Sequence, residues 1–220
     1  MASAVDICNL ALAHIGDEAN VSSISPPDGS VQADHCYRFY PIARDAVLEM
    51  HNWKFAVKRV PLALLDETPP AEWAFAYQYP QCLKVLAVYQ ADTATPASER
   101  LIFDQSEFLN KPASAPFTVE SLQDGTQVIY TNMEDATAMY IGRVTDTSKF
   151  SPLFVVALSR LLASYLAGPI IKGKEGMAVA KGMLEWFLKI EGPQSRAHDA
   201  QGGKNNDYDT FIPASLAARR

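Results

Sequence analysis

The sequence has few cysteines and no excess of positive charge, and both absences exclude classes of protein. Among its 220 residues are three cysteines, Cys8, Cys36 and Cys82, with no C-x-x-C spacing. We expect free thiols rather than a disulfide framework, with Cys8 and Cys36 buried on the apolar faces of helices. The formal net charge of −6 disfavours a dedicated nucleic-acid-binding protein, which would carry a basic surface.

Signals for secretion and membrane insertion are also lacking. The first residues, MASAVDICNLALAHIG, have no basic region and include Asp6, which is not the pattern of a secretory signal. No apolar run approaches the roughly 18 residues that a membrane span needs. With 48% hydrophobic and 20% charged residues, the composition is that of a folded soluble protein, so we expect folding in the cytoplasm without membrane association.

Motifs for nucleotide binding, nucleophilic catalysis and zinc binding are absent. The sequence contains no G-x-x-x-x-G-K-[ST], G-x-G-x-x-G, G-x-S-x-G or H-E-x-x-H. His35 lies beside Cys36, but adjacent residues of a helix point in different directions and do not make a metal site. The acidic pairs at 66–67 and 134–135 fall in turn-like segments, where solvated charge is the ordinary explanation. We therefore expect no catalytic residue, no cofactor and no metal.

What is present begins with two helical patterns in the first 50 residues. A helix is predicted from Ser3, its N-cap, to Gly16, its stop. A second periodic segment runs from about Ala33 to Met50 and includes Pro41, which removes one backbone donor. We expect either a kinked helix or two short helices meeting there.

Short β-rich runs replace the helical spacing after Pro69 and Pro70. Strands are predicted at residues 83–89, 100–104, 117–121, 127–131 and 137–144. Turn formers such as Asp124 and Gly125 separate them. This spacing predicts a small antiparallel sandwich or barrel.

Two further helices and a polar segment complete the chain. The first helix is predicted from Ser151 and Pro152 to an end at Gly168 and Pro169. The second is predicted at 174–190, with an inward face made of Met177, Ala180, Leu184, Phe187 and Leu188. The last 28 residues are polar but contain Tyr208, Phe211, Ile212 and Leu216, so they are either a disordered tail or an arm that orders on a partner.

Together these patterns predict an α+β fold. Its helical bundle is formed by the N-terminal and C-terminal segments, with a small antiparallel β lobe inserted and an extended C-terminal arm. The expected parts are 1–68 and 147–192 for the bundle, 69–146 for the β lobe and 193–220 for the arm.

Three stretches carry a resemblance to a known family: ICNLALAHIG (7–16), ADHCYRFYPIARDAVLEMHNWKFAVKRVPLAL (33–64) and YQYPQCLKVLAVY (77–89). They resemble the podovirus tail tubular protein A family of head-to-tail adaptors. The residues that match its helical patterns are Cys8, Asn9, Ala11, Leu12, Ile15, Gly16, Cys36, Tyr40, Arg44, Asp45, Leu48, His51, Trp53, Phe55 and Ala56. A later match comprises Arg143 to Asp146 with Phe150, Pro152 and Phe154, so the resemblance covers about residues 5–190, loosely in the β region.

The resemblance implies a structural subunit without catalysis. Such a subunit forms a ring, usually twelve-fold, between the portal protein ring and the tail nozzle (tail tubular protein B-like) of a short-tailed phage. DNA would pass through the lumen without sequence-specific binding, and an acidic chain suits a channel that must not retain DNA. The protein would belong to the neck of the virion and be assembled in the host cytoplasm.

Residues for partner contacts are also predicted. They are Arg44, Asp45, Tyr208, Phe211, Ile212, Arg219 and Arg220. In this hypothesis Pro41 bends its helix so that Arg44 and Asp45 lie at a wall shared between subunits, and Trp53 and Phe55 cap the bundle. The alternative is that both aromatic residues are core and that the ion pair is solvated and stabilises by under about 1 kcal/mol.

Two other functions stay open. One is a phage tail hydrolase acting on bacterial surface glycan through carboxylates that the sequence does not pair. The other is a different tail completion or stopper protein with similar helices but another position in the tail.

Overall fold

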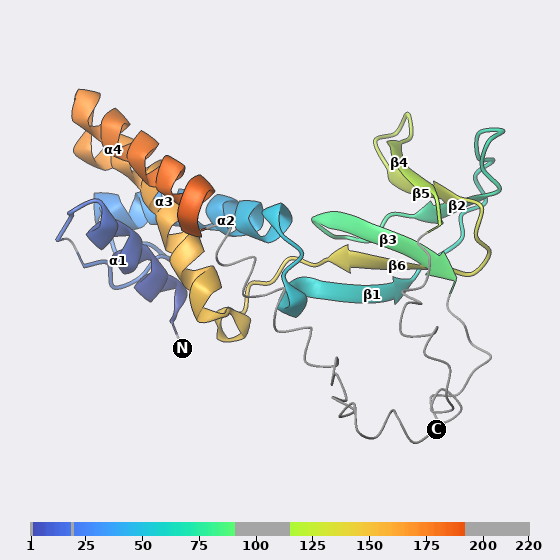
Figure 1. The fold of residues 1–220 in the computed structure, drawn as a ribbon, viewed down its shortest axis with the longest axis horizontal. Coiled ribbons are helices and arrows are strands. Elements are labelled where there is room, and N and C mark those ends of the chain that lie inside the picture. The colour runs from blue at the N-terminus through green and yellow to red at the C-terminus, as the bar shows by residue number, and fades with distance from the viewer. Residues whose placement is uncertain (1, 19, 91–114, 192–220) are drawn as a thin grey trace, which may run out of the picture. The chain divides into compact units, whose positions relative to one another are not determined.

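The structure is a computed structural model that describes residues 2–18, 20–90 and 115–191 (Figure 1). These residues form four α-helices and two three-stranded antiparallel sheets, so the predicted α+β class is confirmed. The chain divides into two compact units, which we call the helical unit (Met1–Val47 with Thr147–Arg220) and the β unit (Leu48–Asp146).

Helix α1 (Ala4–His14) has the boundaries that its sequence predicts. Ser3 and Asp6 form a capping box, in which the Ser3 hydroxyl accepts from the Asp6 amide and the Asp6 carboxylate accepts from the Ser3 amide. At the other end Gly16 has φ 78°, a conformation that glycine adopts without strain, and its amide donates to the Ala13 carbonyl over 3.1 Å. The helix buries Ile7, Cys8, Ala11 and Leu12.

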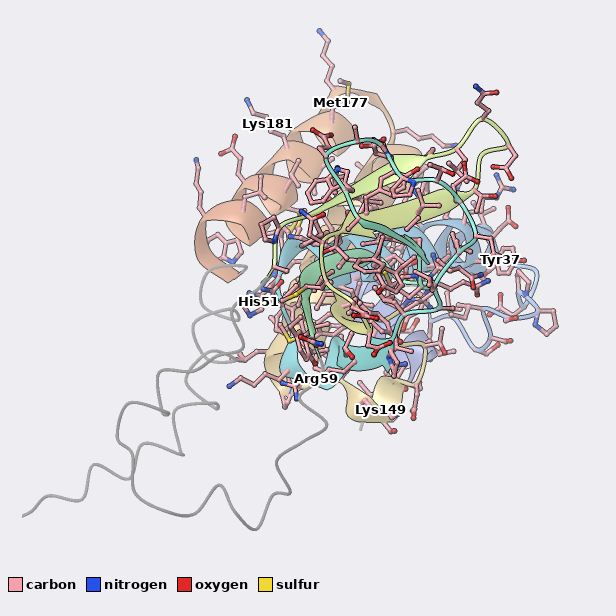
Figure 2. All side chains as sticks on the ribbon, turned by 90° about the vertical axis from the view of Figure 1, so that its right-hand side faces the viewer. Tyr37, His51, Arg59, Lys149, Met177 and Lys181 are labelled. Carbon is pink, nitrogen blue, oxygen red and sulfur yellow. The ribbon has the colours of Figure 1, made fainter. Side chains whose placement is uncertain are left out.

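Helix α2 (Val31–Met50) continues through Pro41, so the expectation of two short helices is wrong. Proline in a helix leaves the carbonyl of the fourth preceding residue, here Tyr37, without its usual partner. Both Pro41 and Tyr37 are exposed, and Tyr37 projects to the outside in Figure 2, so water can satisfy that carbonyl. The opposite face of α2 buries Ala33, Cys36 and other small or apolar residues.

Helix α3 (Pro152–Ile171) starts where predicted and ends later. Ser151 is its N-cap and accepts a hydrogen bond from the Phe154 amide over 3.2 Å. The predicted end at Gly168 and Pro169 is wrong, because the helix runs through both residues. It stops at Lys172, whose φ of 63° turns the chain directly into α4 (Gly173–Trp186) and the π-helical turn Phe187–Glu191.

The composition of α3 corrects another expectation. The helix has 20 residues, and the mean hydropathy of an 18-residue window within it is 1.7. By length and composition alone, such a helix could cross a membrane. The expectation that no run reaches this criterion is therefore wrong. However, 56% of that window is buried, and α3 packs on both α1 and α4 as the central helix of the helical unit.

The orientation of α4 also differs from the prediction. Phe187 is buried, but Met177, Leu184 and Leu188 are 73%, 38% and 49% exposed, and Figure 2 shows Met177 projecting away from the helix. Gly176 faces α3 instead. A Cβ there would lie 2.9 Å from the Ala167 carbonyl oxygen, so the helix approaches α3 through its glycine side.

The β unit contains two sheets. Strands β1 (Val57–Pro61), β6 (Ala136–Ile141) and β3 (Lys84–Gln90) form one in the order β1-β6-β3, after the short 3₁₀ helix Lys54–Ala56. Strands β2 (Phe75–Gln78), β5 (Gln127–Thr131) and β4 (Phe117–Ser121) form the other in the order β2-β5-β4. Strands β3, β4, β5 and β6 lie near predicted positions, whereas β1 and β2 were not predicted. The strand predicted at 100–104 lies outside the described residues.

The β region was expected to start at residue 69, but strand β1 already begins at Val57. The two sheets pack through Tyr77, Val88, Ile129 and Ala136, which come from both of them. The other face of the β2-β5-β4 sheet holds Ala76, Val128 and Tyr130 under Leu65, Trp73 and Leu122. The β unit is thus a small antiparallel sandwich, which is one of the two forms, sandwich or barrel, that the strand spacing predicted.

Candidate functional site

Residues of the first family-like motif tie α1 to the loop that follows it. The Asn9 side chain donates to the Val21 carbonyl over 2.9 Å and accepts from the Val21 amide over 2.8 Å. It also donates to the Asn20 side chain over 2.8 Å. An amide that satisfies both backbone groups of one residue fixes the path of the chain, so Asn9 has a structural role.

Cys8 and Cys36 connect α1 to α2. Both are fully buried, as predicted, and a hydrogen bond joins the two thiols. This hydrogen bond, followed by burial, raises the pKa of the Cys8 thiol. A buried, protonated thiol is a poor nucleophile, so the geometry gives Cys8 a packing role.

Arg44 and Asp45 form an ion pair on α2. The Arg44 Nε and Nη2 atoms lie 2.8 Å and 2.7 Å from the same Asp45 carboxylate oxygen. The Arg44 side chain is only 10% exposed and the Asp45 side chain 24%, so the pair is largely withdrawn from solvent. Removing one partner would therefore leave a poorly solvated charge.

Tyr40 lies one turn before Arg44. Its hydroxyl is buried and makes no hydrogen bond within the part of the chain that the structure describes. Burial raises the pKa of Tyr40 to about 12, although the Arg44 charge acts in the opposite direction. The phenol is therefore neutral and has no means of acting as a base.

His51, Trp53 and Phe55 form a run of aromatic contacts at the start of the β unit. The His51 and Trp53 rings meet edge to face at 5.0 Å, and the Trp53 and Phe55 rings are tilted at 6.0 Å. Trp53 is 2% exposed. Their predicted role as a cap on the bundle concerns the junction of the two units and stays a prediction.

A serine and a histidine that the sequence analysis did not single out meet in the helical unit. His14 Nε2 lies 3.2 Å from the Ser159 hydroxyl, which itself donates to the Val156 carbonyl over 2.9 Å. Because the serine proton is used in that bond, His14 is the donor to Ser159 and does not activate it. Burial, and then the Arg160 charge, lower the pKa of His14 to about 4, and Ser159 is fully buried. The pair is structural. Its residues are 145 positions apart, so no local pattern could have revealed it.

A basic surface feature lies at the start of β1 in the β unit. An open hollow of about 500 Å³ is lined by Lys54, Val57, Lys58 and Arg59 around the start of β1. Arg59 lies at the surface in Figure 2. Among the described residues, its lining contributes positive charge from Lys54, Lys58 and Arg59 and no acidic group or histidine.

The remaining predictions concern the contact residues of the C-terminal arm and metal binding. Tyr208, Phe211, Ile212, Arg219 and Arg220 lie outside the described residues. Within residues 2–18, 20–90 and 115–191, no three His, Cys, Asp or Glu side chains are grouped to hold a metal ion.

Comparison with known proteins adds no assignment, since no protein-family model and no curated protein matches the chain. The reactive residue types of the described motifs, namely cysteine, histidine, arginine and aspartate, are engaged in packing, aromatic contacts or ion pairing. That pattern favours a structural role over a catalytic one.

Proposed function

We propose that the protein is a structural head-to-tail adaptor of a short-tailed phage, similar to tail tubular protein A. It would assemble as a homo-oligomeric ring, a dodecamer, between the portal protein ring and the tail nozzle protein. DNA would pass through its lumen without sequence-specific contacts. The protein would act as part of the virion neck, with no enzymatic step, cofactor or membrane.

The observation that carries this proposal is that the residues of the family-like motifs hold the fold together. Asn9, Cys8 and Cys36 hold α1, its following loop and α2 together, and Arg44 and Asp45 pair with each other. A motif that maintains a fold, rather than lining a cleft, is what an assembly subunit needs. It supports the adaptor over a hydrolase, which needs two carboxyl groups facing one substrate.

The division into two units also supports the proposal. A ring subunit between two different partners has to offer separate surfaces to its neighbours and to each partner. The helical and β units are compact on their own and carry different surface chemistry, apolar on α4 and basic around β1. The net charge of −6 limits retention of DNA in a lumen.

The test is the mass of the purified chain, alone and mixed with its portal ring, by gel filtration with light scattering. The adaptor proposal predicts a complex heavier than the portal by a whole ring of 24.1 kDa chains. In the control, an unrelated ring protein of similar size replaces the portal ring. Its mass should not increase when the purified chain is added. A chain that ignores both portal and nozzle contradicts the proposal, while a single copy or a different neighbour would indicate another tail completion or stopper protein.

The hydrolase alternative has its own assay. Glycan release by the purified protein, abolished by a single Asp or Glu substitution, would replace the structural assignment. The adaptor proposal predicts no release above that of a heat-denatured sample.

A further inference from the structure

Helix α4 presents an apolar stripe to solvent. Met177, Leu184 and Leu188 are 73%, 38% and 49% exposed, and Lys181 lies between them with a side chain that is 79% exposed. Spacings of four, three and four residues place all four on one side of a helix. We call these four residues the outer α4 stripe. Figure 2 shows Met177 and Lys181 projecting from α4 on its outer side.

This exposure is a property of how α4 packs. The inward side uses Gly176, whose position against the Ala167 carbonyl leaves no room for a side chain, together with the buried Phe187. The larger apolar residues are thereby left outside. Contiguous apolar residues on a surface mark a site where something docks, because covering them removes apolar surface from water.

The stripe also carries positive charge at its centre. Glu185 is shared by two lysines, with Lys189 at 3.3 Å and Lys181 at 3.9 Å. Two lysines facing one glutamate leave a net positive charge beside the apolar residues. An occupant with apolar side chains and acidic neighbours would match this surface on both counts.

The sequence of the chain itself supplies such an occupant. Residues 207–212, D-Y-D-T-F-I, combine Tyr208, Phe211 and Ile212 with two aspartates and no basic residue. They lie outside the described part, which stops at Glu191 directly after α4. The 15 residues between can span up to about 50 Å when extended, whereas α4 and its last turn measure only about 28 Å. The segment can therefore reach any point of the stripe in its own chain.

We propose that residues 207–212 dock on the outer α4 stripe of the same chain. Tyr208, Phe211 and Ile212 cover the apolar residues, and Asp207 and Asp209 lie against Lys181. A short tether gives the segment an effective concentration in the millimolar range, so a contact too weak to form between separate molecules closes within one. This goes beyond the adaptor function and does not depend on it, since it concerns the free chain.

The test is photocrosslinking in the full-length chain with Phe211→p-benzoylphenylalanine, followed by mapping of the linked peptides. An equimolar mixture of light and ¹⁵N-labelled chains, made at low concentration, separates links within one chain from links between chains. The expected result is a link from position 211 to the α4 peptide, without mixed isotopes.

Matched variants decide what holds the segment. Leu184→Lys in the stripe should lower the yield of the link about tenfold, because a lysine there loses the apolar contact. Val156→Lys changes a residue of nearly the same exposure on α3, 36% against 38%, and should leave the yield unchanged. Exchanging both aspartates, Asp207→Lys with Asp209→Lys, should lower it about fivefold. The helical signal in circular dichroism confirms that each variant is folded.

Four outcomes overturn the proposal, and the first three concern the position and the response of the link. They are a link to an element other than α4, isotopically mixed links that assign the stripe to a second copy, and a yield that does not respond to Leu184→Lys in a folded chain. The absence of any link above that of a chain denatured in urea contradicts it as well.

Discussion

The two units of the molecule bury their apolar side chains in different ways. The helical unit is organised around α3, in which ten residues are buried between its neighbours. In the β unit, two clusters on opposite faces of the β2-β5-β4 sheet hold four and three buried residues, and further buried side chains, including Trp53 and Ile141, belong to neither cluster. The buried side chains of the helical unit therefore line one central helix, whereas those of the β unit are divided among separate groups.

Strand β5 illustrates this dependence. Ile129 belongs to the cluster between the sheets, and its neighbours Val128 and Tyr130 belong to the cluster on the other face. A strand buried on both faces couples the two clusters, because a shift of its backbone disturbs both. We therefore expect equal losses of apolar volume to have local effects in the helical unit and wider effects in the β unit when they fall on β5.

The largest expected effect is that of Trp53→Ala. Trp53 is the largest fully buried side chain among the described residues and belongs to the β unit, so its removal should cost about 3–5 kcal/mol of unfolding free energy. Urea denaturation gives the total, and hydrogen exchange shows whether the β unit opens first. Trp186→Ala, at 49% exposure, is the control and should cost about 1 kcal/mol or less. A fully stable Trp53→Ala would also remove the proposed capping role.

A pair of glycines in α4 tests the packing of the helical unit. Gly176→Ala places a methyl group 2.9 Å from the Ala167 carbonyl oxygen, which should cost about 1–3 kcal/mol. Gly182→Ala meets nothing within 4 Å and should stabilise the helix by about 0.5–1 kcal/mol. Chemical denaturation of both variants measures the difference. Equal effects would mean that α4 does not approach α3 as described.

Ile129→Val tests, with a smaller loss of apolar volume, whether β5 couples the two clusters of the β unit. Losing one methylene from the cluster between the sheets should cost about 0.5–1.5 kcal/mol. Because β5 serves both clusters, amide exchange should accelerate in β2, β4 and β6 together. Acceleration confined to β5 would show that the clusters are independent.

A dependence on pH is expected in the helical unit. The pKa of His14 is lowered to about 4 from an ordinary value of 6.5, so the unfolded chain binds a proton at a pH where the folded chain does not. The contribution of neutral His14 to the unfolding free energy is fully present above pH 6.5 and is lost as the pH falls towards 4. Urea midpoints at pH 7 and pH 5 should differ more for the native chain than for His14→Gln. An unchanged difference would mean that another group titrates.

Local patterns were sufficient for some of these elements. Strands β4 and β5 have the predicted bounds because each is a short β-rich run beside the Asp124 and Gly125 turn. α1 was recoverable because Ser3 and Gly16 carry both boundary signals. Burial of Cys8 and Cys36 followed from helical spacing alone.

Other features depend on packing that no local pattern encodes. α3 continues through Gly168 and Pro169, although propensity places its end there. The inward side of α4 contains Gly176 and Phe187, whereas hydrophobicity alone also placed Met177, Leu184 and Leu188 inward. β1 was missed because its five residues follow directly on a helical pattern and end in Pro61. Among the candidate site residues, the pairing of Arg44 with Asp45 could be anticipated, while its burial could not.

The central claim is that this chain builds a ring on a portal. Electron microscopy of portal rings mixed with an excess of the purified protein tests it most directly. The account predicts a second ring stacked coaxially on the portal, with an open central channel in end views. Portal rings that stay unchanged at saturating protein, in a preparation whose helical signal shows a folded chain, would contradict it.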